Sequence, residues 1–427
     1  MIHSIILSSL TLLASTEASQ SILALLPSPD LCNTYEKNAL LNTAHINAFL
    51  NSSSCYEASP KRPLAISKPT PPKTNNKWTT KPICQHNAEN QEFCVYTNTH
   101  YANNRGISFF TTPSIATKVL SLPAFTNPSL LDSANDFANA PWEVRNIPGK
   151  GKGLFATRKL ERGDLILANT PLGAYNTHAF TADPGLAPGL GYQYLRKTLE
   201  QLPEKSQESF LGAATHAEGD VVVERIKTNA YVGEIGGGGA FYDIINHDCR
   251  PNSMYYHSAT TLTHSTHASR TIHPGEEITV SYINPLQFRK ERHEALNRWW
   301  GFTCTCSLCS APDAEHHHSD QNMEKIVQLQ TELSDWTPTS PATPKLAEKL
   351  VKTYKDEGLH SVINIGHMFA AFTYNAVGNV AMAFEHAGKA VETSMGGTGS
   401  VNDDEVDMWA LLQNPKGHWS YMKRVRF

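Results

Sequence analysis

Closely spaced cysteines are the part of this sequence that implies chemistry most directly. Cys304, Cys306 and Cys309 follow one another within a single short segment. Three thiolates this close can converge on one tetrahedral ion, with zinc–sulfur bonds of about 2.3 Å. A structural zinc site also needs a fourth ligand, and Cys249 is the nearest other cysteine. The alternative is oxidation: a Cys304–Cys306 bond would be strained, but Cys306 or Cys309 could pair with a distant cysteine.

Two polar segments surround these cysteines. Cys249 lies in the turn 246–252, which reads Asn-His-Asp-Cys-Arg-Pro-Asn, and a second segment, 275–282, ends in Tyr282. A zinc ion shared by both groups of cysteines would pin the tail 302–309 against this turn. The amide and imidazole of the turn suit a polar ligand, and a phenol at the end of a strand can orient reacting groups by hydrogen bonding. An isolated strand-end tyrosine is usually structural, so its interpretation depends on this context.

The elements that must position these groups are short. Alternating and apolar runs predict strands at 142–145, 154–156 and 165–168, with glycine-rich loops at 149–153 and 233–239. Residues 190–215 have helical periodicity. Short strands with frequent glycine turns favour a compact β-rich domain rather than βαβ units.

From about residue 320 the apolar period becomes helical. Leu346, Leu350 and Tyr354 share one face, and residues 361–395 are rich in alanine. The segment 374–390 resembles one tetratricopeptide-like hairpin, although a helical bundle packed on the β-rich domain explains it equally well. The run of three histidines at 316–318 is expected to be a loop.

The amino-terminal third has a different character. Residues 1–18 contain a short apolar stretch followed by small residues, which predicts a secretory signal peptide, the alternative being a short buried helix. The extension 19–135 includes a proline- and lysine-rich linker, and the segment 84–110 could form a disulfide-pinned module. In a secreted chain, four widely spaced cysteines predict two disulfides with three possible pairings. These cysteines are Cys32, Cys55, Cys84 and Cys94.

Length and composition exclude some classes of protein. A chain of 427 residues with 40% hydrophobic residues suits two or three domains with real cores. The net charge of −4 gives no reason to expect direct nucleic-acid binding, and no segment reaches the length of a transmembrane helix.

Five motifs in order resemble the SET domain of SMYD-type and related fungal SET-domain proteins, here without a MYND zinc finger. The glycine-rich segment 150–156 resembles the first cofactor loop, and residues 228–231 resemble the segment ahead of the central turn. The turn 246–252, the segment 275–282 and the post-SET cysteines complete the series. The resemblance implies an α+β protein: a β-rich SET domain with short-stranded sheets around a pseudoknot-like core, a zinc-bound tail and a carboxy-terminal helical domain. The expected boundaries are 136–284 for the SET domain, 285–312 for the post-SET segment and 320–427 for the helical domain.

The resemblance also implies roles for individual residues. The implied activity is S-adenosylmethionine-dependent methylation of lysine in a protein or peptide, with Tyr282 as the catalytic residue. Tyr231, Phe241 and Tyr242 are candidates for the substrate-lysine channel. The implied cofactor-binding residues are Lys150, Gly151, Lys152, Gly153, Asn229, Asn246, His247, Tyr282 and Phe302. The implied structural zinc ligands are Cys249, Cys304, Cys306 and Cys309.

Other interpretations remain open at this point. A non-catalytic SET scaffold could bind a protein partner, and a secreted interaction protein would have its tail cysteines oxidised. Asp248 stands where the family often has serine. A secretory signal conflicts with a nuclear histone substrate, so the alternative compartment is the nucleus or cytoplasm.

Overall fold

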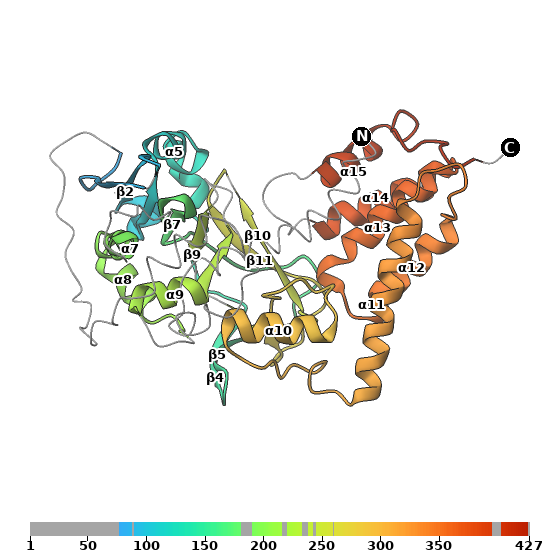
Figure 1. Ribbon diagram of the computed structural model, residues 1–427, viewed down its shortest axis with the longest axis horizontal. Coiled ribbons are helices and arrows are strands. Elements are labelled where there is room, and N and C mark those ends of the chain that lie inside the picture. The colour runs from blue at the N-terminus through green and yellow to red at the C-terminus, as the bar shows by residue number, and fades with distance from the viewer. Residues whose placement is uncertain are drawn as a thin grey trace.

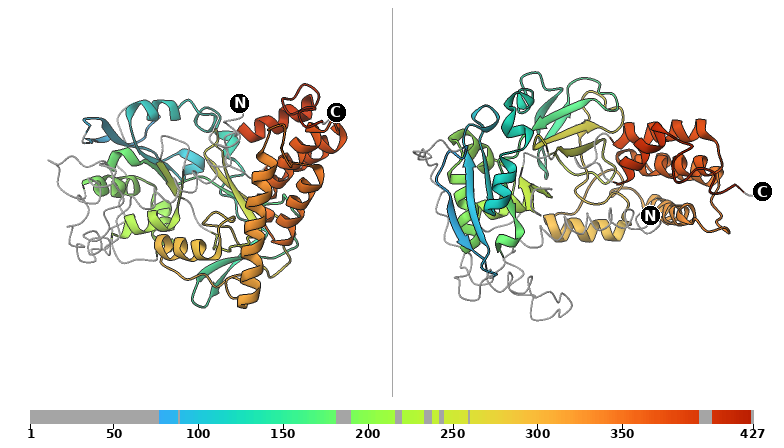
Figure 2. Two further views of the ribbon diagram at one scale, coloured as in Figure 1. Left: turned by 45° about the vertical axis from the view of Figure 1, so that its right-hand side comes forward. Right: turned by 90° about the horizontal axis from the view of Figure 1, so that it is seen from above.

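The computed structural model describes residues 77–87, 89–180, 190–215, 220–232, 238–241, 245–258, 260–394 and 403–425. The expected signal peptide, Cys32, Cys55 and Tyr242 lie outside these ranges. A β-rich part and a helical part lie side by side (Figure 1), and the helices project from one end of the β-rich part when seen from above (Figure 2). Among the described helices, none has both the length and the apolar character of a membrane span.

Twelve described strands form three sheets. They are β1 (Ile83–His86), β2 (Glu92–Asn98), β3 (Ile107–Thr111), β4 (Trp142–Ile147), β5 (Gly151–Ala156), β6 (Leu165–Asn169), β7 (Gly173–Asn176), β8 (Ala230–Val232), β9 (Gly238–Phe241), β10 (Ser253–Ser258), β11 (Thr263–Ala268) and β12 (Glu277–Ile278). The strand orders are β1-β2-β3-β7-β9-β8, β10-β11-β6 and β12-β5-β4. Only β3 and β7 pair in parallel among these strands.

The six-stranded sheet contains strands from both sides of the boundary expected at residue 135. β3 pairs with β7, so the segment 84–110 extends a common sheet instead of forming a module of its own. Cys84 and Cys94, register partners on β1 and β2, are joined by a disulfide. This bond belongs to one of the three possible pairings of the four amino-terminal cysteines.

Short helices accompany the sheets. They are α4 (Tyr101–Asn104), α5 (Pro113–Val119), α6 (Pro123–Thr126), η2 (Pro128–Leu131), η3 (Thr177–Phe180), α7 (Leu190–Glu200), α8 (Glu204–Leu211), α9 (Val221–Asn229) and α10 (Arg289–Trp300). Leu195 and Leu199 of α7 bury their side chains against Phe110 of β3 and its neighbours. The helix expected at 190–215 is two helices, because Pro203 cannot continue the first.

The glycine-rich segments were partly misassigned as loops. Gly151 to Gly153 form the start of β5, which pairs with β4 on one side and β12 on the other. Gly238 and Gly239 belong to β9, while residues 233–237 lie outside the described residues. Glycine lowers strand propensity but does not prevent ladder hydrogen bonds, so pairing with neighbouring strands decides the outcome.

The carboxy-terminal part is helical, as predicted. Its elements are α11 (Asp313–Ser334), α12 (Pro344–Asp356), η4 (His360–Val362), α13 (Ile363–Ala376), α14 (Val380–Ser394) and α15 (Asp403–Gln413). Leu350 and Tyr354 are fully buried in the core that these helices share. α13 and α14 form an antiparallel hairpin, but its tetratricopeptide-like character stays a prediction.

The loop expected at residues 316–318 is wrong, because the three histidines lie in the second turn of α11. Asp313 and Glu315 place negative charge at the amino-terminal end of this helix, which favours helix formation there. The helix therefore begins earlier than the apolar period that starts near Met323 indicates.

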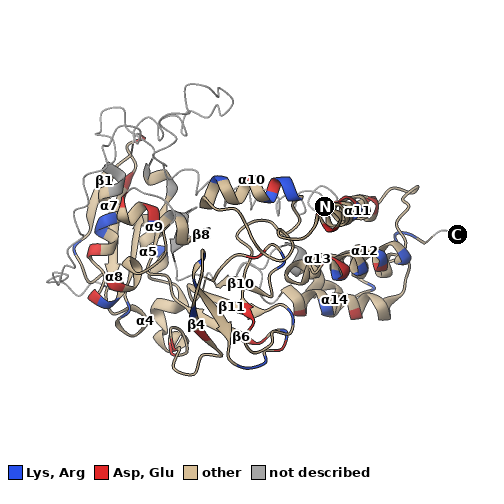
Figure 3. Ribbon diagram, turned by 90° about the horizontal axis from the view of Figure 1, so that it is seen from below, with Lys and Arg blue, Asp and Glu red and all other residues tan. Residues whose placement is uncertain are grey.

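Charged residues of both signs are distributed over the helices and loops in Figure 3, and no described helix in that view is uniformly basic. This distribution agrees with the small net charge of the chain.

Candidate cofactor and metal site

The two polar segments lock together through backbone pairing. The Asp248 N–H donates to the Val280 carbonyl at 2.9 Å, and the Val280 N–H donates to the Asn246 carbonyl at 3.0 Å. Asn252, which is 2% exposed, acts as an additional strand partner. Its Oδ1 accepts the Thr279 N–H at 2.9 Å, and its Nδ2 donates to the Glu277 carbonyl at 2.8 Å. The asparagines at both ends of the turn therefore fix its register against the segment that ends in Tyr282.

His247 connects Tyr282 to the cysteines. Its Nδ1 accepts the Tyr282 N–H at 3.0 Å, and its Nε2 lies 3.4 Å from the Cys249 sulfur. Because Nδ1 is an acceptor, a neutral imidazole carries its proton on Nε2 and donates it toward that sulfur. Burial lowers the pKa of His247 to about 4, so this neutral form predominates near pH 7.

Tyr282 is held as a neutral phenol. Its hydroxyl donates to the Ile245 carbonyl at 2.9 Å. Its ring lies 5.3 Å from the His247 ring and 5.5 Å from the Trp300 ring, measured between centroids. Burial raises the pKa of Tyr282 above its ordinary value, so the group can donate a hydrogen bond at neutral pH.

Asn246 ties the turn to the glycine-rich strand. Its Nδ2 donates to the Lys152 carbonyl at 2.9 Å and to Glu277 Oε1 at 3.0 Å. The other Glu277 oxygen pairs with Lys150 Nζ at 3.6 Å. A Cβ on Gly153 would lie 3.1 Å from Asn246 Nδ2 and 2.5 Å from an Ile147 methyl carbon. A larger residue at this position would therefore require these side chains to move, including the Asn246 amide.

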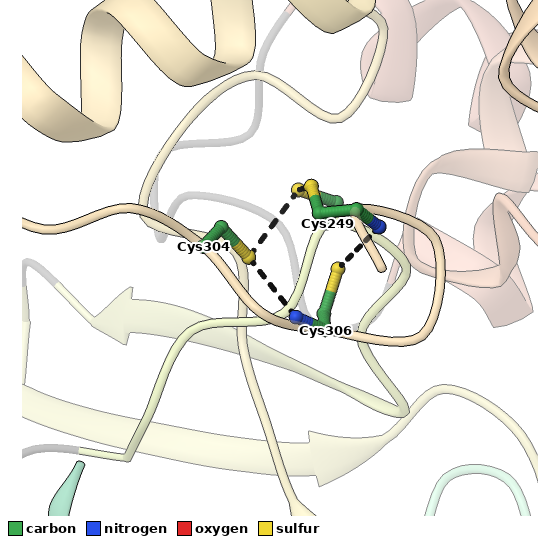
Figure 4. Close-up of side chains that lie close together, drawn as sticks. Cys249, Cys304 and Cys306 are labelled. Atoms are coloured by element: carbon green, nitrogen blue, oxygen red, sulfur yellow. Dashed lines mark hydrogen bonds between the residues drawn. The ribbon is translucent and has the colours of Figure 1, made fainter. Parts of the chain in front are cut away.

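The four cysteines expected to bind metal come together. Their sulfur atoms all lie within 4.8 Å of one another, with Cys249 3.5 Å from Cys309 and 4.0 Å from Cys304. Four sulfurs bound tetrahedrally to one zinc ion would be separated by about 3.8 Å, given the usual bond length. The Cys306 N–H points to the Cys304 sulfur at 3.4 Å (Figure 4). The Cys309 N–H points to the Cys306 sulfur at 3.5 Å. The donor set and its spacing therefore fit a structural zinc ion.

Within the cluster, the pKa values of Cys249 and Cys304 are raised above the ordinary value, whereas that of Cys306 is lowered. Contacts with the thiols of Cys249, Cys304 and Cys309 hold the pKa of Cys306 well below its ordinary value. The thiolate is the form that binds a metal ion.

Helix α10 delivers the tail to this cluster. Gly301 follows the helix in a left-handed conformation (φ 68°), and its N–H caps the Asn297 carbonyl. The chain then passes through Phe302, whose ring centroid lies 6.1 Å from that of His247, and enters the cysteines. Trp300 and Leu296 bury their side chains among the same residues. The tail therefore reaches the turn through both apolar contacts and the sulfur cluster.

Some predicted site residues have other contacts. The Asn229 amide at the end of α9 donates to the Ala214 carbonyl at 2.8 Å and to the Arg225 carbonyl at 2.6 Å. Lys152 is exposed, and only its carbonyl contacts Asn246. The ring of Tyr231 packs against that of Tyr255 at 4.7 Å. The side chain of Phe241 lies outside the described residues, as does all of Tyr242.

Sequence reasoning missed two residues that complete the arrangement. Glu277 joins Asn246 to Lys150, and Trp300 packs against the Tyr282 ring. Both lie inside the motifs that drew attention, but a motif does not reveal which of its members face one another.

Comparison with known proteins agrees with this geometry. Residues 151–283 match the SET domain family model. The chain is 30% identical over 184 residues to histone-lysine N-methyltransferase set5 of Schizosaccharomyces pombe, covering 42% of this chain and 53% of that protein. It is 32% identical over 144 residues to the SET5 protein of the same name in Saccharomyces cerevisiae, covering 30% and 27%. N-lysine methyltransferase SMYD2 of Bos taurus is 35% identical over 81 residues, which is 18% of each chain.

The matched segments span about half of the fission-yeast protein and about a quarter of the budding-yeast protein. The family match includes the interlocked segments, because it runs from the start of β5 to the residue after Tyr282. Residues 151–283 of this chain are therefore similar to the SET domain family.

Proposed function

We propose that this chain is an S-adenosylmethionine-dependent protein-lysine N-methyltransferase of the SET type. The observation that carries the proposal is the convergence of Asn246, His247 and Tyr282 at the crossing of two paired segments. The relatives named as lysine methyltransferases support the same activity. The proposed partner is a lysine-containing protein or peptide.

The residues around this crossing have chemistry suited to such a cofactor. Bound S-adenosylmethionine would supply a methyl group on a positively charged sulfur. Lys150 and the glycine edge of β5 offer a cation and close backbone approach, while Asn246 and His247 offer polar groups from the turn. Tyr282 presents a neutral phenol that can orient an incoming amine by hydrogen bonding. Phe302 and Trp300 surround these groups with apolar surface.

The sulfur cluster is proposed to hold one zinc ion through Cys249, Cys304, Cys306 and Cys309. Its role is structural, because four protein ligands leave no open position for a substrate. The metal would fix the tail that carries Phe302 beside His247.

Isothermal titration with S-adenosylmethionine tests the proposal, with the wild-type protein measured beside Asn246→Ala. The variant loses both hydrogen bonds from the Asn246 amide, to Lys152 and to Glu277, and frees β5 from the turn. We expect the wild type to bind and the variant to bind roughly tenfold more weakly or worse, a loss of about 1.4 kcal/mol.

Asn375→Ala is the matched control, because Asn375 is a fully buried amide in the helical part that also bridges two segments. It should lower the free energy of unfolding without changing affinity for the cofactor. A folded wild type that binds no S-adenosylmethionine would favour the non-catalytic scaffold. If the wild type does bind the cofactor, transfer of labelled methyl groups to mixed core histones would establish activity. The names of the yeast relatives suggest this probe.

We also propose that residues 1–18 direct the chain into the secretory route. The Cys84–Cys94 disulfide supports an oxidising compartment, since such bonds are rare in the cytosol. Amino-terminal sequencing of the full chain expressed in a secreting eukaryotic host should find a mature protein that begins at Ser19. Leu10→Arg, which interrupts the apolar stretch, should abolish this processing. An intracellular wild type that retains residues 1–18 would support the nuclear or cytoplasmic alternative.

A further inference from the structure

The arginine inside the turn 246–252 contacts residues outside the segment 151–283. Arg250 NH1 donates to the Cys249 carbonyl at 2.7 Å and to the Pro285 carbonyl at 3.0 Å. Its Nε and NH2 donate to Glu357 at the end of α12, at 3.0 Å to the carbonyl and 2.7 Å to Oε1. One guanidinium therefore joins the metal-binding turn, the segment that follows Tyr282, and the helical part.

The backbone at Glu357 is fixed by the hydrogen bonds that end helix α12. The Gly358 N–H donates to the Lys355 carbonyl and the Leu359 N–H to the Tyr354 carbonyl, which is the hydrogen-bond pattern of a Schellman motif. Gly358 takes the left-handed conformation (φ 70°) that this motif requires. The helix end therefore fixes the place of the carboxylate independently of Arg250.

The carboxylate has two further partners on α11. Ser319 donates to Glu357 Oε1, and Asn322 Nδ2 donates to Oε2 at 2.9 Å. The side chains of Arg250 and Glu357 are only 10% and 6% exposed. Removing one member of such a buried pair leaves an uncompensated charge in a place that water reaches poorly.

A second arginine makes a parallel link nearby. Arg162 donates to the Ser269 carbonyl and, at 3.5 Å, to the His360 carbonyl just beyond Glu357. Ser269 in turn contacts the turn, because its N–H donates to the Asn252 carbonyl at 2.8 Å. The turn is thus connected to residues 357–360 of the helical part at two places, directly from Arg250 and from Asn252 through Ser269 and Arg162.

We propose that Glu357 is a positioning residue for the cofactor and metal site, so that the helical part sets the geometry of the turn 246–252. The proposal rests on the proposed function for its effect on S-adenosylmethionine. Because Arg250 donates to the Cys249 and Pro285 carbonyls, moving this guanidinium would disturb both a cysteine of the cluster and the segment that follows Tyr282. The helical part then acts as a structural component of the site in addition to any role in binding partners.

Glu357→Gln in the full-length zinc-loaded protein tests this role. The change removes the negative charge that faces Arg250 and keeps the shape of the side chain. We expect hydrogen exchange in the peptide covering residues 246–252 to become roughly tenfold faster, because its local opening becomes easier. Loss of zinc to a competing chelator should accelerate, and affinity for S-adenosylmethionine should fall by roughly tenfold.

Glu348→Gln is the matched control on the same helix. Glu348 pairs with His386 and Tyr374 inside the helical part. This variant should weaken the helical part without changing exchange in residues 246–252, zinc retention or cofactor affinity. If both variants affect the turn equally, the effect comes from general destabilisation and the positioning role is wrong.

A double-mutant cycle with Arg250→Gln measures the coupling directly. Removing both charges should disturb the turn less than the sum of the two single changes. Additive effects would contradict the proposal. Should Glu357→Gln fail to fold, Ser319→Ala combined with Asn322→Ala loosens the same carboxylate without removing its charge. Unchanged exchange in residues 246–252 in that double variant would also contradict it. Exchange and zinc retention are measured without S-adenosylmethionine, so they test the positioning role even if the wild type binds no cofactor.

Discussion

Removing zinc is expected to weaken S-adenosylmethionine binding by roughly a hundredfold while most of the chain stays folded. The loss follows from the cluster, which joins the tail to the turn through sulfurs on both segments. Without metal, four adjacent thiols have no common partner, and structural zinc in isolated peptides contributes apparent free energies of about 10–16 kcal/mol. The sheets and the helical core contain their own buried residues and should survive. Cys306→Ser should have the same effect as chelation.

Metal analysis and titration check this result together. Wild-type protein should contain one zinc ion per chain, and affinity for S-adenosylmethionine in the metal-free sample should fall by roughly a hundredfold, or about 2.7 kcal/mol. Replacing Cys84 and Cys94 together by serine is the control, because their disulfide joins β1 and β2 of the six-stranded sheet and is not part of the four-cysteine cluster. That variant should keep its zinc and bind cofactor normally. A folded, metal-free wild type with oxidised tail cysteines would instead support the secreted interaction protein.

The sequence predicts the approach of the four cysteines well, because chemistry strongly restricts how such residues can be arranged. Three cysteines in six residues limit the possible ligand geometries, and a closed site demands one more thiolate. Cys249 was the nearest candidate, and the structure places its sulfur among the other three. The crossing of residues 246–252 with residues 276–282 is likewise expected from the resemblance, since both motifs belong to it.

Long-range pairing is much harder to predict. Nothing in the composition of β3 indicates that it pairs with β7, more than sixty residues later, so the amino-terminal strands were expected to form a separate module. Gly151 and Gly153 resemble loop residues by propensity, yet pairing with Ile147 and Arg145 of β4 makes them part of a sheet. Local signals describe what a segment prefers, whereas sheet membership depends on partners that lie far away in the chain.

Single ion pairs are harder still. Arg250 and Glu357 lie 107 residues apart, and neither belongs to a periodic pattern that marks it as buried. Asn229 shows the opposite difficulty, since its motif suggested the cofactor while its amide donates to the Ala214 and Arg225 carbonyls. Its role at the cofactor stays a prediction, which Asn229→Ala in the same titration would test.

Tyr282→Phe is expected to lower kcat for methyl transfer by roughly a hundredfold or more, the usual loss when one positioned hydrogen-bond donor is removed from an active site. The variant keeps the ring that packs between His247 and Trp300, so the surrounding side chains should hold their positions. It loses only the hydroxyl, which donates to the Ile245 carbonyl. Affinity for S-adenosylmethionine should therefore change little, and the effect should appear in single-turnover transfer of a labelled methyl group.

Tyr354→Phe separates this catalytic effect from the cost of losing a buried hydroxyl. Tyr354 is fully buried in the helical part, where its hydroxyl accepts a hydrogen bond from Gln330 at 2.9 Å. The loss of that contact leaves the Gln330 amide without its partner and should cost about 1–2 kcal/mol of stability, with no change in kcat. If both variants reduce stability and neither reduces kcat, the Tyr282 hydroxyl serves only to hold the end of the segment 275–282 in place. If Tyr282→Phe alone reduces kcat at unchanged cofactor affinity, the Tyr282 hydroxyl contributes to the reaction. The control variant excludes a general effect of losing a buried hydroxyl, and the titration excludes weaker cofactor binding.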